Sequence, residues 1–411
     1  MKIENSLPIL LLAIPLFFMM QIGHTSPVEE HVVSYSGFQV WTVATNTDEE
    51  RSALLKYVQL YVPKPFQKEL GKKLSEANIT FVIKIADLKE VIKNENANIK
   101  TSTFSKSKSA HNMNWTSYHR LADIYDYMSY LAATYPSLVS LINIGSSYEK
   151  RPLYVLRISN SSSLCSKPVI WIDGGIHARE WISPAVTTYI IKQLVEVSAN
   201  SKMLFDVDWY IMPVMNPDGY EYTHVYNRLW RKTRSMTSSP SCRGVDPNRN
   251  FGFKWGGLGT STNPCSDIYK GTKAFSEPET LATSNFILGK ANQIKMYLTL
   301  HSYGQSALIP WGYDVAYPND YNDMLALAKS AVSKFLKYKF SVGNSAALYY
   351  PAAGGSDDWA KSIGIKYSYT FELADTGTYG FLLPASNILP VAQDFFPALG
   401  VFATKVATLK I

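Results

Sequence analysis

The 411-residue sequence has only three cysteines, only seven histidines and no long run of basic residues. A nucleic-acid-binding protein is expected to cluster its lysines and arginines. Here the 40 basic residues are scattered, so the net charge of +7 indicates no nucleic-acid partner. Beyond residue 20 no apolar stretch is long enough to cross a bilayer, so we expect no membrane association. With 46% hydrophobic and 13% aromatic residues, the chain is neither disordered nor of low complexity.

The one strongly apolar stretch lies at the N-terminus. Lys2 precedes LPILLLAIPLFFMM, residues 7–20, and small polar residues follow. This order is typical of a secretory signal peptide, and the two prolines and short length argue against a membrane anchor. We therefore predict a signal peptide at residues 1–26 and a secreted protein.

The cysteines fit a secreted chain, in which one pair of the three is expected to be oxidised. A bond between Cys242 and Cys265 would close a modest loop and contribute roughly 3 kcal/mol in the chain-entropy model. Cys165 lies in a polar stretch, NSSSLCSKP, and is the candidate for the unpaired thiol.

The first part of the chain, residues 27–108, predicts a small α+β unit that ends in a linker. Strand patterns at 38–43 and 79–85 accompany helix patterns at 48–61 and 86–96, and a polar stretch rich in serine and lysine follows. Such a linker is open to proteolysis, and Lys106 and Lys108 suit a trypsin-like protease. This is the plan of a zymogen, with an activation pro-domain of the open-sandwich type. An ordinary two-domain protein with a flexible joint is the alternative.

Residues 109–411 predict one α/β domain in which buried strands alternate with helices. Strands are expected at 168–175, 206–219, 294–302 and 365–373, and helices at 183–199, with Ser183 as the cap, and at 322–338. This alternation favours a mixed, largely parallel central sheet covered by helices on both faces. Sites in such sheets form outside the carboxyl ends of the strands.

Three polar residues stand at predicted strand ends: His177, His301 and Glu372. Any one of them alone is more often a structural polar residue, but three at one rim favour a functional site. Glu180 follows His177 in a His-x-x-Glu pair, which by itself is a weak signal. Two histidines and one glutamate form a known ligand set for catalytic Zn²⁺, and zinc lowers the pKa of a water molecule to about 7.

Two basic segments follow. Residues 226–235 carry Arg228, Arg231, Lys232 and Arg234, and residues 244–252 carry the pair Asn248 and Arg249. Guanidinium groups bind a carboxylate through two hydrogen bonds and stabilise an oxyanion. A solvated basic face or structural salt bridges are the simpler interpretation of Lys232 and Arg234.

Seven motifs in order resemble the secreted zinc metallocarboxypeptidases of the pancreatic, or digestive, carboxypeptidase A/B family. They are GGIHAREWISPA, NPDGYEYTH, NRLWRKTRS, VDPNRNF, LHSYGQ, GGSDDWA and YSYTFELADTGTYGFLLP. The resemblance covers about residues 113–411, and residues 27–108 resemble less distinctively the activation segment of that family. It implies a catalytic domain at 109–411, one Zn²⁺, peptide or protein C-termini as substrate, a trypsin-like activating protease and a monomer.

The resemblance also implies roles for the matching residues. The zinc ligands would be His177, Glu180 and His301. Glu372 would be the general base, and Arg231 would polarise the scissile carbonyl. The substrate's carboxylate would be held by Asn248 and Arg249, with Tyr350 closing over the substrate and Arg179 and Tyr303 as outer contacts. Tyr349 competes for the role of Tyr350, but the spacing to Glu372 favours Tyr350. Cys242 and Cys265 match a family disulfide.

The segment GGSDDWA admits two interpretations. Its acids, Asp357 and Asp358, suit the first turn of a helix. The resemblance assigns Asp357 to the floor of the pocket for the substrate's last side chain, where an aspartate goes with lysine and arginine. We therefore expect B-type specificity from Asp357 and a cap or hydrogen bond from Asp358. The alternatives are A-type specificity for apolar ends, a catalytically silent binding relative, or an unrelated zinc esterase or amidase.

Two residues depart from the family pattern. Ala374 stands where relatives commonly carry arginine, directly after the strand with Glu372, and Pro397 falls in the expected last helix. Neither is a proposed ligand.

Overall fold

The computed structural model describes residues 32–44, 57–96, 111–160 and 167–411. The predicted signal peptide and its flanking residues, the activation lysines Lys106 and Lys108, and Cys165 lie outside these ranges. Within them no helix combines the length and the apolar character needed to cross a membrane.

The N-terminal unit is a three-stranded antiparallel sheet with two helices. Its elements are β1 (Gln39–Ala44), β2 (Tyr57–Val62), α2 (Lys64–Glu76), β3 (Phe81–Ile85) and α3 (Leu88–Glu95), with strand order β2-β1-β3. The predicted helix over 48–61 is wrong for residues 57–61, which form β2. Leu60 and Val62 both reach the apolar cluster around Trp41, a spacing of two that suits a strand. Pairing with β1, where Trp41 faces Leu60, therefore decides the conformation.

The large domain is built on one eight-stranded sheet. Its strands are β4 (Val139–Ser146), β5 (Pro152–Ile158), β6 (Val169–Asp173), β7 (Asp208–Met212), β8 (Ile294–Ser302), β9 (Ser306–Ile309), β10 (Ser341–Asn344) and β11 (Tyr367–Leu373). The order is β10-β9-β11-β8-β6-β7-β5-β4. The central strands β11, β8, β6 and β7 are parallel to one another, whereas β9 joins β11, and β5 joins β7 and β4, in antiparallel fashion. The predicted mixed, largely parallel sheet is confirmed.

Helices cover both faces of this sheet, as predicted. One face packs against α4 (Leu121–Thr134), α5 (Ile182–Val195), α8 (Tyr321–Val332) and α11 (Ile388–Ala407), and the other against α7 (Pro278–Leu288) and α10 (Ser356–Ser362). The side chains of β6 alternate accordingly, because Ile170 and Ile172 join the first core and Val169 and Trp171 the second. The remaining helices are α6 (Pro217–Val225), α9 (Ser345–Leu348) and the 3₁₀ turns Ser198–Leu204, Pro247–Arg249, Gly380–Leu382 and Ala385–Asn387.

Helix α5 starts one residue earlier than predicted, and Ser183 is not its cap. The Ser183 hydroxyl donates to the carbonyl of Leu300 at 2.5 Å and accepts from the amide of Gly175 at 3.1 Å. It therefore ties the turn after β6 to the neighbouring strand β8. Pro397 lies inside the last helix, α11, and Ala374 is buried directly after β11.

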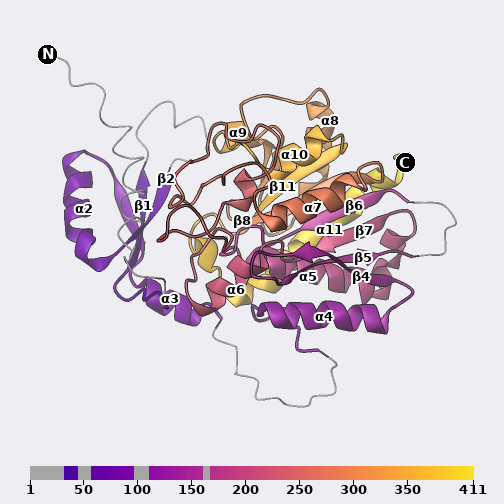
Figure 1. Ribbon diagram of the computed structural model, residues 1–411, viewed down its shortest axis with the longest axis horizontal. Helices are drawn as coiled ribbons and strands as arrows, with labels where there is room; N and C mark the ends of the chain where they lie inside the picture. The colour runs from indigo at the N-terminus through magenta and orange to yellow at the C-terminus, as the bar shows by residue number, and fades with distance from the viewer. Residues whose placement is uncertain (1–31, 45–56, 97–110, 161–166) are drawn as a thin grey trace.

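The N-terminal unit packs against one end of the large domain (Figure 1). An apolar cluster joins Val40, Ile85 and Leu88 to Leu229 and Leu382. Beside it, the Arg228 guanidinium donates two hydrogen bonds to the Glu95 carboxylate at 2.5 and 2.7 Å, with both side chains buried. Apolar packing and a buried ion pair thus hold the two units together.

Candidate metal centre and substrate pocket

The sheet brings the predicted strand-end residues together. His301 near the end of β8 and Glu372 near the end of β11 are paired residues of these adjacent parallel strands. His177 and Glu180 lie in the turn between β6 and α5. Gly174 is the first residue of that turn. A Cβ added to Gly174 would lie 2.6 Å from the hydroxyl of Thr187 on helix α5, so the close approach of this helix leaves no room for a side chain.

Three of these residues form one buried cluster. His177 Nδ1 lies 2.8 Å from Glu180 Oε1, and His301 Nδ1 lies 3.1 Å from Glu180 Oε2. The two Nδ1 atoms are 3.1 Å apart. All three side chains are at most 4% exposed, and they are the one group within the described ranges whose ligand atoms could hold a metal ion.

Asp246, which the sequence analysis did not select, orients this cluster from behind. Its Oδ1 lies 3.1 Å from His177 Nε2, and its Oδ2 accepts hydrogen bonds from Nε and Nη2 of Arg231 at 3.1 and 2.8 Å. A carboxylate at Nε2 holds the ring proton there and leaves the Nδ1 lone pair for a metal. The signal was present in the sequence, since Asp246 stands two residues before Asn248 in VDPNRNF.

The cluster fits a zinc ion. Two facing imidazole nitrogens and a carboxylate form the donor set of catalytic zinc sites, and the fourth position is open to water or substrate. The Nδ1 atoms converge with no protein donor between them, and one imidazole already has the supporting carboxylate that metal-binding histidines use.

Burial and neighbouring charges shift the pKa values in the site. Burial raises the pKa of Glu372 to about 8, and the charge of Glu180 adds to this while His301 and Arg231 oppose it. Burial would lower the pKa of His301, but the charge and hydrogen bond of Glu180, together with nearby carboxylates, raise that pKa to about 9. Burial likewise opposes ionisation of Asp246, yet the charges of Arg231 and His177 hold its pKa well below the usual range.

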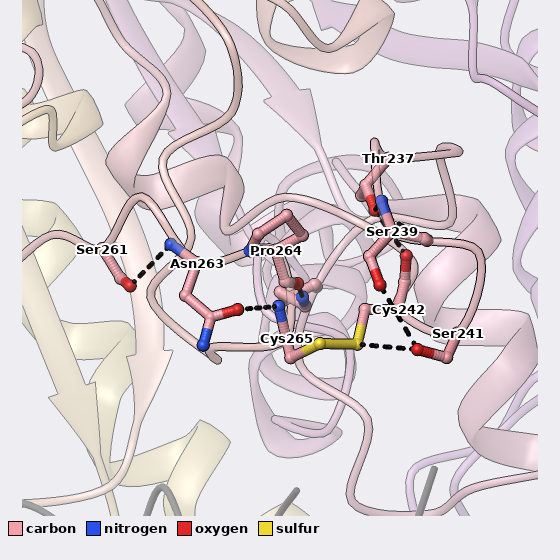
Figure 2. Close-up of a disulfide and its surroundings, with 9 residues drawn as sticks. Thr237, Ser239, Ser241, Cys242, Ser261, Asn263, Pro264 and Cys265 are labelled. Atoms are coloured by element: carbon pink, nitrogen blue, oxygen red, sulfur yellow. Dashed lines mark hydrogen bonds between the residues drawn. A yellow bond between two sulfur atoms is a disulfide. The ribbon is translucent and has the colours of Figure 1, made fainter. Parts of the chain in front are cut away.

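The segment that supplies Asp246, Asn248 and Arg249 is closed by a disulfide (Figure 2). Cys242 and Cys265 are bonded across a sequence separation of 23 residues, as the resemblance implied. The Asn263 side chain accepts from the amide of Cys265 at 3.0 Å, and the carbonyl of Pro264 accepts from Lys232 Nζ at 2.6 Å. The ends of the segment are thereby held together.

Asn248, Arg249 and Asp357 are brought close together by the chain around Gly354 and Gly355. Asn248 Oδ1 accepts from the amide of Ser356 at 2.9 Å, which joins the 3₁₀ turn to the start of α10. A Cβ added to Gly355 would lie 2.9 Å from Asp357 Oδ1 and 3.8 Å from Asn248 Oδ1. The Arg249 guanidinium is 4% exposed and donates to the carbonyls of Gly259 and Asn248.

The two adjacent acids have different surroundings. Asp358 is fully buried, and its carboxylate accepts from the amides of Gly312 and Tyr313 at 2.8 and 2.9 Å. Asp357 is 6% exposed, burial raises its pKa, and within the described ranges it forms no ion pair with a basic side chain. The predicted hydrogen-bonding role of Asp358 thus has partners in the 312–313 loop, whereas the described ranges give Asp357 no ion pair with lysine or arginine.

The remaining candidates lie around the mouth of the site. Tyr350 is 45% exposed. Arg179 contacts Asp267 at 3.1 Å and stacks on Phe381. The Tyr303 hydroxyl donates to Gln59 Oε1 of the N-terminal unit at 2.6 Å. Of these three, Tyr303 and Arg179 contact other parts of the chain, and Tyr350 is the most exposed.

A buried His–Glu–His cluster at the carboxyl edge of a mixed α/β sheet defines a zinc hydrolase centre. A family model described as zinc carboxypeptidase matches residues 124–398. The chain is 47% identical to carboxypeptidase B of Astacus astacus over 300 residues, 72% of this chain and 98% of that protein. It is 41% identical to carboxypeptidase A1 of Sus scrofa over 349 residues, 83% and 82% of the two chains.

A solved structure of thrombin activatable fibrinolysis inhibitor agrees over nearly the whole chain. The TM-score is 0.82 at 33% identity, and the match covers 92% of this chain and 100% of that one. The chain belongs to the zinc carboxypeptidase family, with zinc as its cofactor, and the predicted family membership is confirmed.

The contact between Asp246 and His177 yields a prediction about zinc affinity. Replacing Asp246→Asn removes the charge that holds the His177 ring and should weaken zinc binding roughly 10- to 100-fold. Competition with a chromogenic chelator measures this change. Asp394→Asn is the matched control, because Asp394 accepts backbone hydrogen bonds from residues 336–338, away from the metal cluster. Equal affinity in the wild type and Asp246→Asn would contradict the supporting role.

Proposed function

We propose that the protein is the secreted zymogen of a zinc exopeptidase that removes C-terminal lysine and arginine from peptides and proteins. The signal peptide at 1–26, the pro-domain and cleavable linker at 27–108 and the catalytic domain at 109–411 are parts of this proposal. So are the roles given below to individual residues.

One observation carries the proposed specificity. The chain around Gly354 and Gly355 brings together two buried ionisable groups, Arg249 and Asp357, and neither forms an ion pair within the described ranges. A buried charge is costly unless it is paired. A C-terminal lysine or arginine would supply both partners, since its carboxylate matches Arg249 and its cationic side chain matches Asp357. Asn248, the neighbour of Arg249 in the chain, accepts a hydrogen bond from Ser356, the neighbour of Asp357.

The same arrangement supports cleavage at the C-terminal end of a chain and not at internal peptide bonds. The guanidinium of Arg249 needs a free carboxylate, which an internal peptide bond does not present. A bidentate carboxylate–guanidinium pair fixes the orientation of the substrate's end as well as its affinity. The same requirement disfavours an esterase or amidase that acts on substrates without a free C-terminus.

Each step of the hydrolysis has a candidate residue. Zinc held by His177, Glu180 and His301 would supply Lewis acidity and an activated water. Glu372 would take the proton of that water and deliver it to the leaving amine. Glu372 would be favoured in its ionised form, despite its burial, by a cation bound at these ligands. Arg231 would donate to the oxyanion that develops from the scissile carbonyl.

The N-terminal unit supports a zymogen. Gln59 accepts from the Tyr303 hydroxyl and donates to the carbonyl of Gly377 at 3.0 Å. It thereby lies against a residue that we assign to outer substrate contacts. Arg228 beside Arg179 is paired with Glu95 of the same unit. A polypeptide substrate would have to displace these contacts.

Glu372→Gln tests the general base. The amide cannot take a proton, so kcat should fall at least about 100-fold while zinc content stays near one per chain. Stopped-flow or discontinuous peptide assays give kcat, and metal analysis gives the zinc content. Near-normal turnover in this variant would rule out the proposed base.

Asp357→Ile tests the selector. Loss of the buried countercharge should lower kcat/KM about 100-fold for a peptide that ends in arginine and should favour the same peptide ending in leucine. Asp358→Asn serves as the control, because the Asp358 carboxylate accepts hydrogen bonds from the backbone amides of Gly312 and Tyr313. An unchanged preference in Asp357→Ile would favour A-type specificity set by other residues.

Trypsin treatment tests the zymogen and the family activity together. The full-length secreted chain should be nearly inactive, gain activity after cleavage in the 97–110 segment, and lose it with a zinc chelator. N-terminal sequencing identifies the cleaved bond, and a variant with Lys106 and Lys108 changed to glutamine should resist activation. Peptides with an amidated C-terminus should stay intact. Full activity before trypsin would contradict the zymogen, and activated protein without peptidase activity would favour the silent relative.

A further inference from the structure

Tyr349 directs its hydroxyl group toward the interior of the site, beside Glu372. It follows helix α9, and its Oη lies 2.8 Å from the hydroxyl oxygen of Ser306, which is fully buried on strand β9. Ser306 is the residue opposite Glu372 in the antiparallel pair β9–β11. Opposite residues of such a pair project from the same face. The pair of hydroxyl groups therefore lies next to the side chain of Glu372.

Gly304 shows how closely Tyr349 approaches that strand. A Cβ added to Gly304 would lie 2.0 Å from Tyr349 Oη and 3.5 Å from the Cβ of Glu372. The amides of Gly304 and Gln305 both donate to the carbonyl of Leu373, the residue after Glu372, at 3.0 and 3.2 Å. The tip of the tyrosine ring thus occupies the space of a missing side chain, with the strand that carries Glu372 on its other side.

The two consecutive tyrosines have different surroundings. Tyr350 is 45% exposed at the mouth of the site. Burial raises the pKa of Tyr349, and the charge of Glu372 raises it further. The Tyr349 phenol therefore stays neutral across the physiological pH range and keeps its proton for a hydrogen bond.

We propose that Tyr349 is a positioning residue for the hydrolysis, which together with Ser306 forms a wall that confines the side chain of Glu372. The inference rests on the proposed role of Glu372 as general base. A general base has to lie within hydrogen-bonding reach of the proton that it takes, and small misplacements cost large factors in rate. Tyr349 acts through Ser306 and the packing against Gly304, and it requires no contact with the substrate.

The test is a double-mutant cycle on the activated enzyme. Tyr349→Phe keeps the ring and removes the hydroxyl, and Ser306→Ala removes the other half of the pair. Each change should lower kcat about fivefold to tenfold, the scale of one lost neutral hydrogen bond, and leave KM within about twofold. The double variant should be no slower than either single variant, because both remove the same interaction. Substrate is a peptide that ends in arginine.

Tyr125→Phe is the matched control, since it removes a phenol that donates to the carbonyl of Pro152 at 2.7 Å at the far edge of the sheet. It should leave kcat unchanged. Wild-type kcat in both site variants, a loss confined to KM, or additive losses in the double variant would each overturn the inference. Thermal melting of every variant separates a folding defect from lost positioning, and Ser306→Ala probes the same pair if Tyr349→Phe folds poorly. Activity that survives Glu372→Gln would instead reject the general base itself.

Discussion

The need to compensate buried charge at the carboxyl edge of the sheet is the constraint on which the site depends. His177, Glu180, His301, Asp246 and Glu372 are brought together at this edge, and the first four are at most 4% exposed. Three ionised carboxylates in so small a volume would repel one another without a cation. Arg231 compensates Asp246, and zinc compensates the histidine–glutamate cluster. Metal binding is therefore coupled to the electrostatics of folding at this edge as well as to chemistry.

The compensation of charge also distinguishes the metal cluster from the neighbouring pair Arg249 and Asp357. At the metal centre the protein supplies ligands for a cation that stays bound. The neighbouring Arg249 and Asp357 are buried and form no ion pair within the described ranges. The disulfide between Cys242 and Cys265 and the contact of Asn248 with Ser356 hold the segment that carries Arg249 in place against the start of α10. A preorganised site of this kind avoids part of the ordering cost of binding.

The sequence was most informative where one residue type has one strong preference. Continuous apolar strands predicted β6, β8 and β11, and the rule that sites lie at strand ends then selected His177, His301 and Glu372. It was least informative where tertiary pairing decides. Residues 57–61 fit a helical pattern but become a strand because β1 offers them a partner. Ser183 looks like a helix cap, yet its hydroxyl bonds to Leu300 on β8, a contact that no local pattern contains.

Asp246 and Tyr349 show why supporting residues are harder to predict than ligands. A ligand is recognisable from its own chemistry, whereas a supporting residue is defined by what stands behind it in three dimensions. Asp246 acquires its role because the 3₁₀ turn at Pro247–Arg249 places the carboxylate against His177 and Arg231 at once. Tyr349 is adjacent to Tyr350 in sequence, yet it faces inward because Gly304 leaves space for its hydroxyl. Two neighbouring tyrosines with the same chemistry thus have different surroundings, because only Tyr349 is hydrogen-bonded to the buried Ser306 on β9, while Tyr350 is 45% exposed.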